Sequence, residues 1–307
     1  MSKFTGSVPI GVIGGSGLYT MDSLEVLEER VVETPFGQPS DALIIGRLED
    51  LEVAFLSRHG RGHRLMPSEL PFRANIWAMK SIGVRYLISV SAVGSLQEAY
   101  APRHVVVPDQ FIDRTRHRPD TFFGDGLVAH VGFADPVCPV LTDLMADAAE
   151  EAFEDSGSTP EEVSVHRGGT YVCMEGPQFS TRAESFLYRS WGADIIGMTN
   201  LQEAKLAREA EICYGTFGMV TDYDCWHETE EDVTVEAVLE ILRDNAATGQ
   251  AAVRGTVRRL AEAGLEPRGD HTCPDALRTA LITQPDVVPA EAVERLRPIL
   301  GRYFSGS

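Results

Sequence analysis

Two aspartates flank a tyrosine at the end of an apolar run in GMVTDYDCWHE, residues 218–228. Carboxylates that leave a buried strand form a solvated turn, a metal site or acceptors for the N–H groups of a heterocycle. A metal would need a further ligand, for which His227 is the candidate. An aspartate can also give or share a proton with a ring nitrogen that gains basicity as a bond breaks. Asp222 and Asp224 are therefore candidates for proton transfer and for recognition of an exocyclic amine.

A basic run follows another strand candidate in SRHGRGHRLMPSE, residues 57–69. The planar fork of Arg58 suits a phosphate, and the neighbouring His59 adds a second donor. A solvated basic loop is the common alternative, but this run directly follows a strand and contains two glycines. A histidine-based metal site is a weaker third alternative, since no carboxylate stands at metal-ligand spacing. The pattern favours an anion site.

Four further segments carry small, hydroxyl or aromatic residues after apolar runs. GGSG, residues 14–17, lets backbone N–H groups approach a phosphate or forms a tight turn. It is not GxGxxG, which argues against a dinucleotide site. SVSAVGS, MEGPQFSTRAES and GMTN are compatible with a ligand or with ordinary core packing. Their candidate ligand-contacting residues, with the serine of GGSG, are Ser16, Ser91, Phe179, Ser180, Met198 and Thr199.

The elements that must position these residues read as alternating strands and helices. Five β-branched apolar runs, at 10–17, 53–60, 86–95, 193–200 and 214–224, each lead into small, polar or charged residues. Helical patterns cover 71–83, 181–192 and 233–263, and a short helix is expected near 289–303. We expect one α/β domain over residues 1–269 with a mixed, mostly parallel sheet. Residues 270–307 form a C-terminal extension packed on the body or a neighbouring subunit.

Composition excludes several classes of function. The formal charge of −19 argues against nucleic-acid and anionic-membrane binding, which need a basic footprint. No apolar run reaches the length of a membrane span, and the N-terminus shows no secretory pattern. The five cysteines are scattered and form no CxxC, so we expect buried thiols in a cytoplasmic protein, with no metal site.

Long strings of the chain resemble the trimeric purine nucleoside phosphorylase family, most closely its branch acting on 5′-methylthioadenosine. The resemblance runs from IGVIGGSGLY to NAATGQAA and includes TPFGQPSDALIIG, RHGRGHRLMPSELPFRANIWAMKSIG, DQFIDRTRHRP, EGPQFSTRAESFLYRSWGADIIGMT and TDYDCW. It implies the nucleoside phosphorylase fold, a homotrimer, no cofactor, and inorganic phosphate as co-substrate.

The resemblance also implies a role for each matching residue. Asp222 serves the purine N7 as the catalytic group, and Asp224 binds the 6-amino group, where relatives acting on 6-oxopurines tend to carry asparagine. The implied phosphate ligands are Ser16, Arg58, His59, Ser91, Ala92 and Thr199. Base and sugar contacts fall on Phe179, Val93, Gly94 and Met198. Residues that set specificity, including the apolar 5′ pocket, are Ser180, His130, Val233, Val235 and Val238.

The implied reaction is phosphorolysis of 5′-methylthioadenosine to adenine and 5-methylthioribose 1-phosphate. A nucleosidase would use water, which the Arg58 and His59 cluster argues against. A phosphorylase for a 6-oxopurine or another 5′-modified nucleoside is the nearest alternative, and Asp224 argues against the oxo form. A non-catalytic nucleotide sensor on the same scaffold and an NAD-dependent dehydrogenase remain as more distant alternatives.

Overall fold

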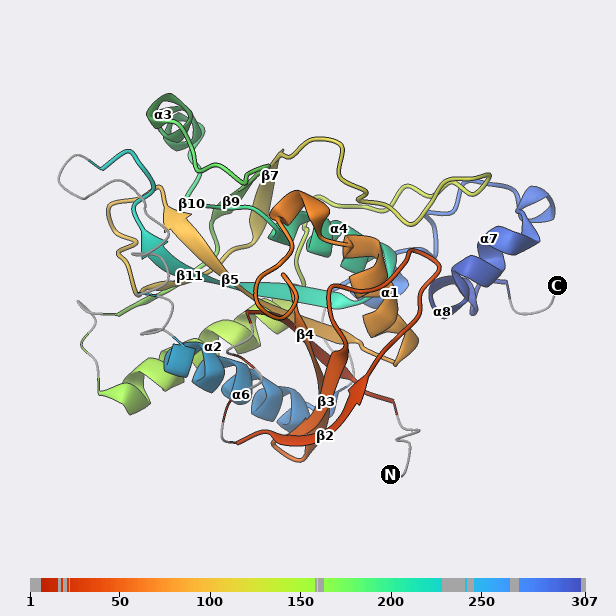
Figure 1. Ribbon diagram of the computed structural model, residues 1–307, viewed down its shortest axis with the longest axis horizontal. Helices are drawn as coiled ribbons and strands as arrows, with labels where there is room; N and C mark the ends of the chain where they lie inside the picture. The colour runs from red at the N-terminus through yellow and green to blue at the C-terminus, as the bar shows by residue number, and fades with distance from the viewer. Residues whose placement is uncertain are drawn as a thin grey trace.

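A branched sheet forms the centre of the molecule (Figure 1). The computed structural model describes residues 7–15, 18, 21, 23–157, 159, 163–227, 241, 246–265 and 271–304, and within them the sheet has 11 strands. They are β1 (Ile10–Gly14), β2 (Glu25–Arg30), β3 (Leu43–Leu48), β4 (Leu51–Ser57), β5 (Tyr86–Ser95), β6 (Val105–Val107), β7 (Gln110–Arg114), β8 (Val165–Arg167), β9 (Thr170–Met174), β10 (Ile195–Gly197) and β11 (Cys213–Asp222).

Strand β5 is the branch point of this sheet. It pairs in parallel with β1 and with β11 along most of its length, and its end pairs antiparallel with β10. The pairs β1–β4, β6–β8, β7–β9 and β9–β10 are also parallel, whereas β2–β3, β3–β4 and β6–β11 are antiparallel. The predicted fold class, one α/β domain with a mixed and mostly parallel sheet, is therefore confirmed.

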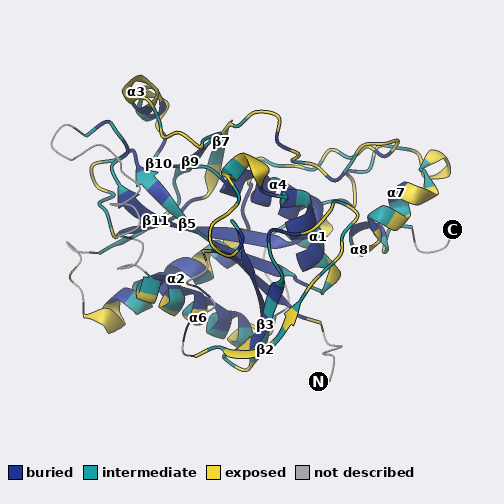
Figure 2. Cartoon of the chain, viewed as in Figure 1, coloured by how far each residue is buried: buried dark blue, intermediate teal, exposed yellow. Residues whose placement is uncertain are grey.

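Helices cover both faces of the sheet. In Figure 1, α2 (Pro139–Ser156) and α6 (Ala246–Glu262) lie on one face, and α1 (Phe72–Ser81) and α4 (Asn200–Glu209) lie on the other. Strand β1 shows why its sequence is apolar throughout. Ile10 and Val12 join the core under α2 and α6, while Ile13 joins the core under α1 and α4. A strand buried on both faces needs apolar residues at every position, and Figure 2 shows the central strands as the buried part of the chain.

The predicted elements appear with shorter boundaries. The five strand candidates correspond to β1, β4, β5, β10 and β11, and two of the helices to α1 and α3 (Arg182–Ser190). Pro71 is the N-cap of α1, outside its first turn. Of the expected helix at 233–263, α6 forms the second half. Residues 228–240 and 242–245 lie outside the described residues.

The C-terminal segment, residues 271–304, packs on the body through α7 (Ala290–Arg295) and α8 (Arg297–Leu300). Leu296, Ile299 and Leu300 join the core under α1 and α4. Glu211 holds the segment with its buried carboxylate, whose Oε1 accepts hydrogen bonds from Leu277 N (3.0 Å) and the Tyr303 hydroxyl (2.6 Å). The domain boundary at 269/270 falls outside the described residues and stays a prediction. Short 3₁₀ turns lie at Pro67–Glu69, Cys273–Asp275 and Pro285–Val287.

Candidate active site

The ends of four parallel strands bring distant segments to one edge of the sheet. Strands β1, β4, β5 and β11 run in the same direction, so their carboxyl ends meet, as is usual for ligand sites of α/β sheets. The N–H of Arg58 donates to the carbonyl of Gly14 at 2.9 Å, which joins the ends of β4 and β1. Gly94 stands opposite Asp222 in the register of β5 and β11. The sequence-predicted anion and carboxylate segments therefore share this edge.

Arg58 is buried, and its guanidinium pairs with Glu203 of α4. Nε donates to Oε1 of Glu203 at 2.5 Å, and Nη2 donates to Oε2 at 3.3 Å and to Ser89 Oγ at 2.6 Å. Nη1 donates to the carbonyl of Val90 at 2.9 Å. Burial opposes the charge, but the Glu203 carboxylate outweighs it and raises the pKa of Arg58. These bonds leave one N–H of Nη1, within the described structure, to meet an anion.

A polar network surrounds this ion pair. Asn200, the first residue of α4, donates from Nδ2 to Ser89 Oγ (2.9 Å) and to Thr216 Oγ1 (2.7 Å). Its Oδ1 accepts from the Tyr171 hydroxyl at 2.9 Å, and the Tyr214 hydroxyl donates to Glu203 Oε2 at 3.0 Å. The network fixes the N-terminus of α4 beside Arg58. Helix N-termini attract anions through their free N–H groups and dipole.

His59 is neutral and presents an acceptor. Its Nδ1 lies 2.7 Å from the carbonyl of Leu65, which can only accept, so Nδ1 carries the proton. The pKa of His59 is lowered to about 4, mainly by burial and in smaller part by the neighbouring Arg58 and His63, while the bond to Leu65 acts in the opposite direction. The neutral ring then offers the lone pair of Nε2. This corrects the expectation that His59 adds a second donor.

Asp222 sits at a bulge at the end of β11. Its Oδ2 accepts from the Thr221 hydroxyl at 2.6 Å, and its Oδ1 accepts from the N–H of Asp224 at 2.8 Å. Burial raises the pKa of the Asp222 carboxyl to about 6, although these two hydrogen bonds lower it. A carboxyl group that titrates near neutrality can give or take a proton during a reaction.

Asp224 has a buried carboxylate oxygen without a hydrogen-bond partner among the described residues. Its residue is 7% exposed, yet Oδ2 has no hydrogen-bond partner within the described structure. Burial raises the pKa of this carboxyl, although the nearby Ser185 and Ser180 hydroxyls lower it. A buried polar atom without a partner costs free energy, about 1–3 kcal/mol. Such an atom is well suited to a donor that a ligand brings.

Gly94 allows the two aspartates to lie against the backbone of β5. A Cβ atom at this position would stand 2.9 Å from Asp222 Oδ1 and 3.1 Å from Ile196 Cγ2. The missing side chain of Gly94 therefore leaves room for the Asp222 carboxylate and for a ligand that contacts it. Three other residues of β5 are also predicted to contact the ligand. The side chain of Val93 packs into the core, so only its backbone faces the site, and Ser91 and Ala92 are partly buried.

Arg118 is a site residue that the sequence analysis did not single out. From the loop after β7 it donates to the carbonyl of Met198 (2.5 Å) and to that of Glu175 (2.5 Å), and it pairs with the Glu175 carboxylate (3.3 Å). It thereby fixes the loop after β9 against the segment that leads into α4. Thr199, the N-cap of α4, is buried beside it. The string DQFIDRTRHRP contains Arg118, but no spacing marks its partners.

The remaining predicted residues divide into three groups. Ser180 lies near Asp224, because the Cys225 thiol donates to its carbonyl at 3.2 Å, and the adjacent Phe179 is 43% exposed. His130 is elsewhere: it is exposed, and its N–H donates to the carbonyl of Ala280 in the C-terminal segment. Ser16, Val233, Val235 and Val238 lie outside the described residues.

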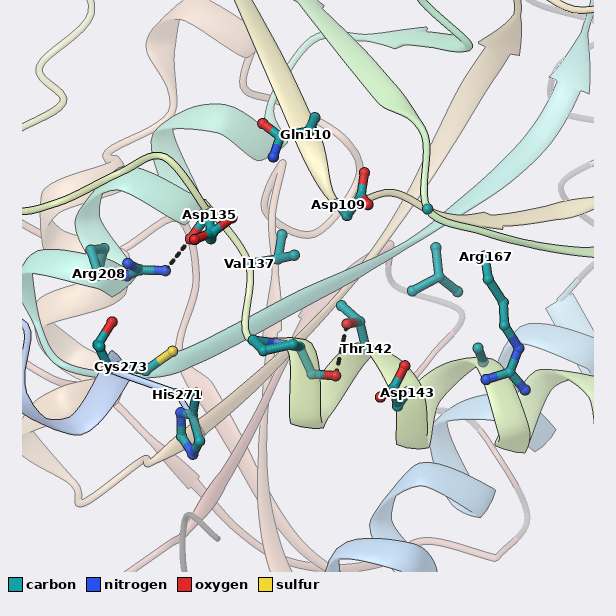
Figure 3. Close-up of a pocket in the computed structure, with 15 residues that line it drawn as sticks. Asp109, Gln110, Asp135, Val137, Thr142, Asp143, Arg167, Arg208, His271 and Cys273 are labelled. Atoms are coloured by element: carbon teal, nitrogen blue, oxygen red, sulfur yellow. Dashed lines mark hydrogen bonds between the residues drawn. The ribbon is translucent and has the colours of Figure 1, made fainter. Parts of the chain in front are cut away.

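A pocket of about 510 Å³ lies away from this edge (Figure 3). Arg167, Arg208, His271 and Cys273 are among the residues that line it, and none of the sequence-predicted site residues that the structure describes does. Arg58, Asp222 and Asp224 thus lie at the carboxyl ends of the parallel strands, separate from this pocket. No helix of the described residues is long and apolar enough to cross a membrane.

The pKa of Asp222 predicts a pH-dependent stability difference. A carboxyl raised to about 6 from about 3.9 in the unfolded chain binds its proton more tightly when folded. Stability therefore falls as pH rises from about 4 to 6, and the loss is complete above that range. In Asp222→Asn the amide oxygen still accepts from Asp224 N, and the NH₂ donates to Thr221 Oγ1, whose hydroxyl can donate to the carbonyl of Val93 instead. Because the titration is removed, we expect a gain of about 1–3 kcal/mol at pH 7.5 that vanishes near pH 4.

Thermal unfolding of both proteins across this pH range measures the difference. Asp286→Asn, the same substitution at an exposed carboxylate, is the matched control. An equal effect of Asp222→Asn at both pH values would contradict the raised pKa.

Comparison with known proteins assigns the chain to a family. Residues 9–258 match the model of the Phosphorylase superfamily. The chain is 60% identical over 294 residues to an S-methyl-5′-thioadenosine phosphorylase of Gloeobacter violaceus, covering 96% of this chain and 95% of that protein. It is 56% identical over 295 residues to the Geobacter sulfurreducens protein of the same name, covering 96% and 98%.

Solved structures agree with this assignment. A methylthioadenosine phosphorylase from an antarctic soil metagenomic library superposes with a TM-score of 0.89 at 49% identity, covering 96% of this chain and 99% of that one. A Schistosoma mansoni methylthioadenosine phosphorylase in complex with adenine gives a TM-score of 0.75 at 36% identity, covering 85% and 93%. The chain is therefore a member of the phosphorylase superfamily.

Proposed function

We propose that this protein cleaves 5′-methylthioadenosine with inorganic phosphate, releasing adenine and 5-methylthioribose 1-phosphate. The observation that carries the proposal is the pair of buried carboxyl groups at the end of β11, one titrating near neutrality and one with a free acceptor oxygen. The names of relatives at 56–60% identity support the same reaction. The resemblance, rather than the geometry, supplies the methylthio group, because Val233, Val235 and Val238 lie outside the described residues.

Asp222 acts on the leaving adenine. As the C1′–N9 bond lengthens, electron density moves into the purine and N7 becomes more basic. A carboxyl with a pKa of about 6 is protonated in about a tenth of molecules at pH 7, so the acid form is accessible. It gives its proton to N7, and Asp224 Oδ2 accepts a hydrogen bond from the 6-amino group. That contact satisfies the buried oxygen and selects adenine over a 6-oxopurine.

The phosphate binds at the neighbouring strand ends. The free N–H of Arg58 and the N-terminus of α4 at Thr199 attract the dianion, with Ser16, Ser91 and the backbone of Ala92 completing the set by resemblance. Nε2 of His59 accepts a hydrogen bond from the single P–OH group of HPO₄²⁻, which keeps its proton, and this contact orients the remaining oxygens toward C1′. The dianion stabilises the cationic sugar and then attacks it, so no covalent enzyme intermediate and no cofactor are needed.

Phosphate dependence is the direct test. Adenine release from 5′-methylthioadenosine should require phosphate. Release of hypoxanthine from inosine and of adenine from adenosine should be slower. Asp222→Asn should lower kcat by about 10²–10⁴-fold, the usual value of a general acid. Release without phosphate would identify a nucleosidase. Unaltered turnover in Asp222→Asn would contradict the role assigned to Asp222. No turnover of any of these nucleosides would favour a non-catalytic sensor.

Asp224 predicts the base preference. In Asp224→Asn the amide can donate to a 6-oxo group, so the ratio of kcat/KM for 5′-methylthioadenosine to that for 5′-methylthioinosine should fall by about 10–100-fold, equivalent to about 1–3 kcal/mol. Kinetics with both nucleosides measure the ratio. A parallel fall for both bases would mean that Asp224 has only a structural role.

We also propose a homotrimer. Helix α3 leaves large apolar side chains on the surface: Phe186 is 49%, Leu187 44% and Trp191 44% exposed. Three large apolar side chains exposed within six residues favour an interface with a partner at this helix. A neighbouring subunit would also supply residues such as His130, whose own contacts are with the C-terminal segment, to complete the 5′ pocket.

Sedimentation measures the assembly. The protein should sediment at three times 33.6 kDa, and Phe186→Asp should dissociate it. Val31→Asp, which alters another exposed apolar residue, is the matched control and should leave the mass unchanged. A monomer, or a trimer indifferent to Phe186→Asp, would contradict the proposed interface.

The proposed location is cytoplasmic, which the five free thiols favour. Recovery of the protein in a membrane or extracellular fraction would contradict it.

A further inference from the structure

Four metal-ligating side chains meet at the opposite end of β11 from Asp222. Cys138, Cys213, His271 and Cys273 place one sulfur or nitrogen atom each within 4.8 Å of one another. The three cysteines are buried and the histidine is partly buried. Cys213 begins β11, whereas Asp222 ends it, so the strand separates this cluster from the candidate active site.

The spacing of these atoms fits a tetrahedral metal ion. In a zinc site with Zn–S of about 2.3 Å and Zn–N of about 2.0–2.1 Å, ligand atoms stand about 3.8 Å (S to S) and about 3.6 Å (S to N) apart. Here Nδ1 of His271 lies 3.7 Å from Cys138 Sγ and 3.9 Å from Cys213 Sγ. Only small adjustments would bring four ligands around one ion.

The ligands come from three segments that the backbone already holds together. Cys138 is the N-cap of α2, and its N–H donates to the carbonyl of Tyr214 in β11 at 2.8 Å. The N–H of Cys213 donates to the carbonyl of Arg85 at 2.9 Å. Cys273 begins a 3₁₀ turn in the C-terminal segment, which Glu211 anchors through Leu277. The positions of the three cysteines are thus set by the fold.

Ordinary packing does not explain the histidine. Buried cysteines often serve as small apolar side chains, but the two hydrogen-bond partners of His271 Nδ1 in the described structure are thiol sulfurs, which are weak partners. Figure 3 shows His271 and Cys273 side by side at one end of the 510 Å³ pocket, which gives an ion a path to them. Arg208 lines the same pocket and can offset the negative charge of thiolates.

We propose that Cys138, Cys213, His271 and Cys273 bind a structural zinc ion. A three-sulfur, one-nitrogen set suits Zn²⁺, and four protein ligands leave no position open for a substrate. The ion ties the C-terminal segment to α2 and to the start of β11. Sequence patterns alone do not predict this site, because the four ligands are spread over more than a hundred residues and form no CxxC.

Elemental analysis of the intact protein tests the site without reference to activity. The protein, made without a histidine tag and passed through gel filtration in buffer with a chelator, should retain one zinc ion per chain. Co²⁺ exchanged into it should give the visible bands of a tetrahedral ion and a thiolate charge-transfer band. Cys273→Ser should lose the metal, and its thermal midpoint should fall by about 5 °C or more. Cys225→Ser, at a partly buried cysteine outside the cluster, should retain the metal.

The possible outcomes separate the alternatives. Five titratable thiols in denaturant with no metal would overturn the proposal, as would three thiols and no metal, which would mean a disulfide within the cluster. Iron or copper in place of zinc, or loss of metal from Cys225→Ser as well, would also overturn it. Because the wild-type metal content is measured directly, a variant that fails to fold leaves the test intact. The result is independent of whether 5′-methylthioadenosine is the substrate.

Discussion

The buried ion pair between Arg58 and Glu203 is the contact on which the arrangement of the candidate site depends. It joins the end of β4 to the first turn of α4, two segments far apart in the chain, across the centre of the sheet. An isolated charge in this position would be strongly unfavourable, and removing either partner of a buried pair typically costs about 3–5 kcal/mol. Ser89 and Tyr214 donate to the Glu203 carboxylate, and Asn200 in turn bonds Ser89, so the pair is held in one geometry that, within the described structure, leaves one N–H of Arg58 for an anion. The ion pair therefore sets the positions of two proposed phosphate ligands, Arg58 and the N-terminus of α4.

The two aspartates of the site, unlike Arg58, are buried without an ion-pair partner among the described residues. Burial raises the pKa of both Asp222 and Asp224. Their environment is unfavourable for the folded protein alone and becomes favourable when a purine brings donors and a basic nitrogen. The well-paired Arg58 thus lies in the same site as the uncompensated carboxyl of Asp222, whose burial is unfavourable for the free protein. The backbone pairing of β5 with β11 connects the two ends of the site.

Local sequence predicted those parts of the structure that depend on local pattern. Apolar runs ending in polar residues located β1, β4, β5, β10 and β11, and with them the aspartates and Arg58. The partners of these residues could not be predicted, because each is brought in by tertiary packing. Glu203 stands in an ordinary helical pattern, Arg118 in a polar loop, and the tautomer of His59 depends on the carbonyl of Leu65. The cysteine cluster is the extreme case, since only the fold places its members together.

The order of strands also has a consequence during synthesis. Strand β5 is flanked by β1 from the preceding chain, but its other neighbours, β10 and β11, are encoded much later, with Tyr86 paired to Cys213. At about 5–20 residues per second, the ribosome needs roughly 6–25 s between these two residues. Until β10 and β11 are made, one edge of β5 lacks the partners it has in the folded protein, and until Glu203 is made Arg58 lacks its counter-ion. The nascent chain therefore carries an open, apolar strand edge that a chaperone is suited to cover until the second half emerges.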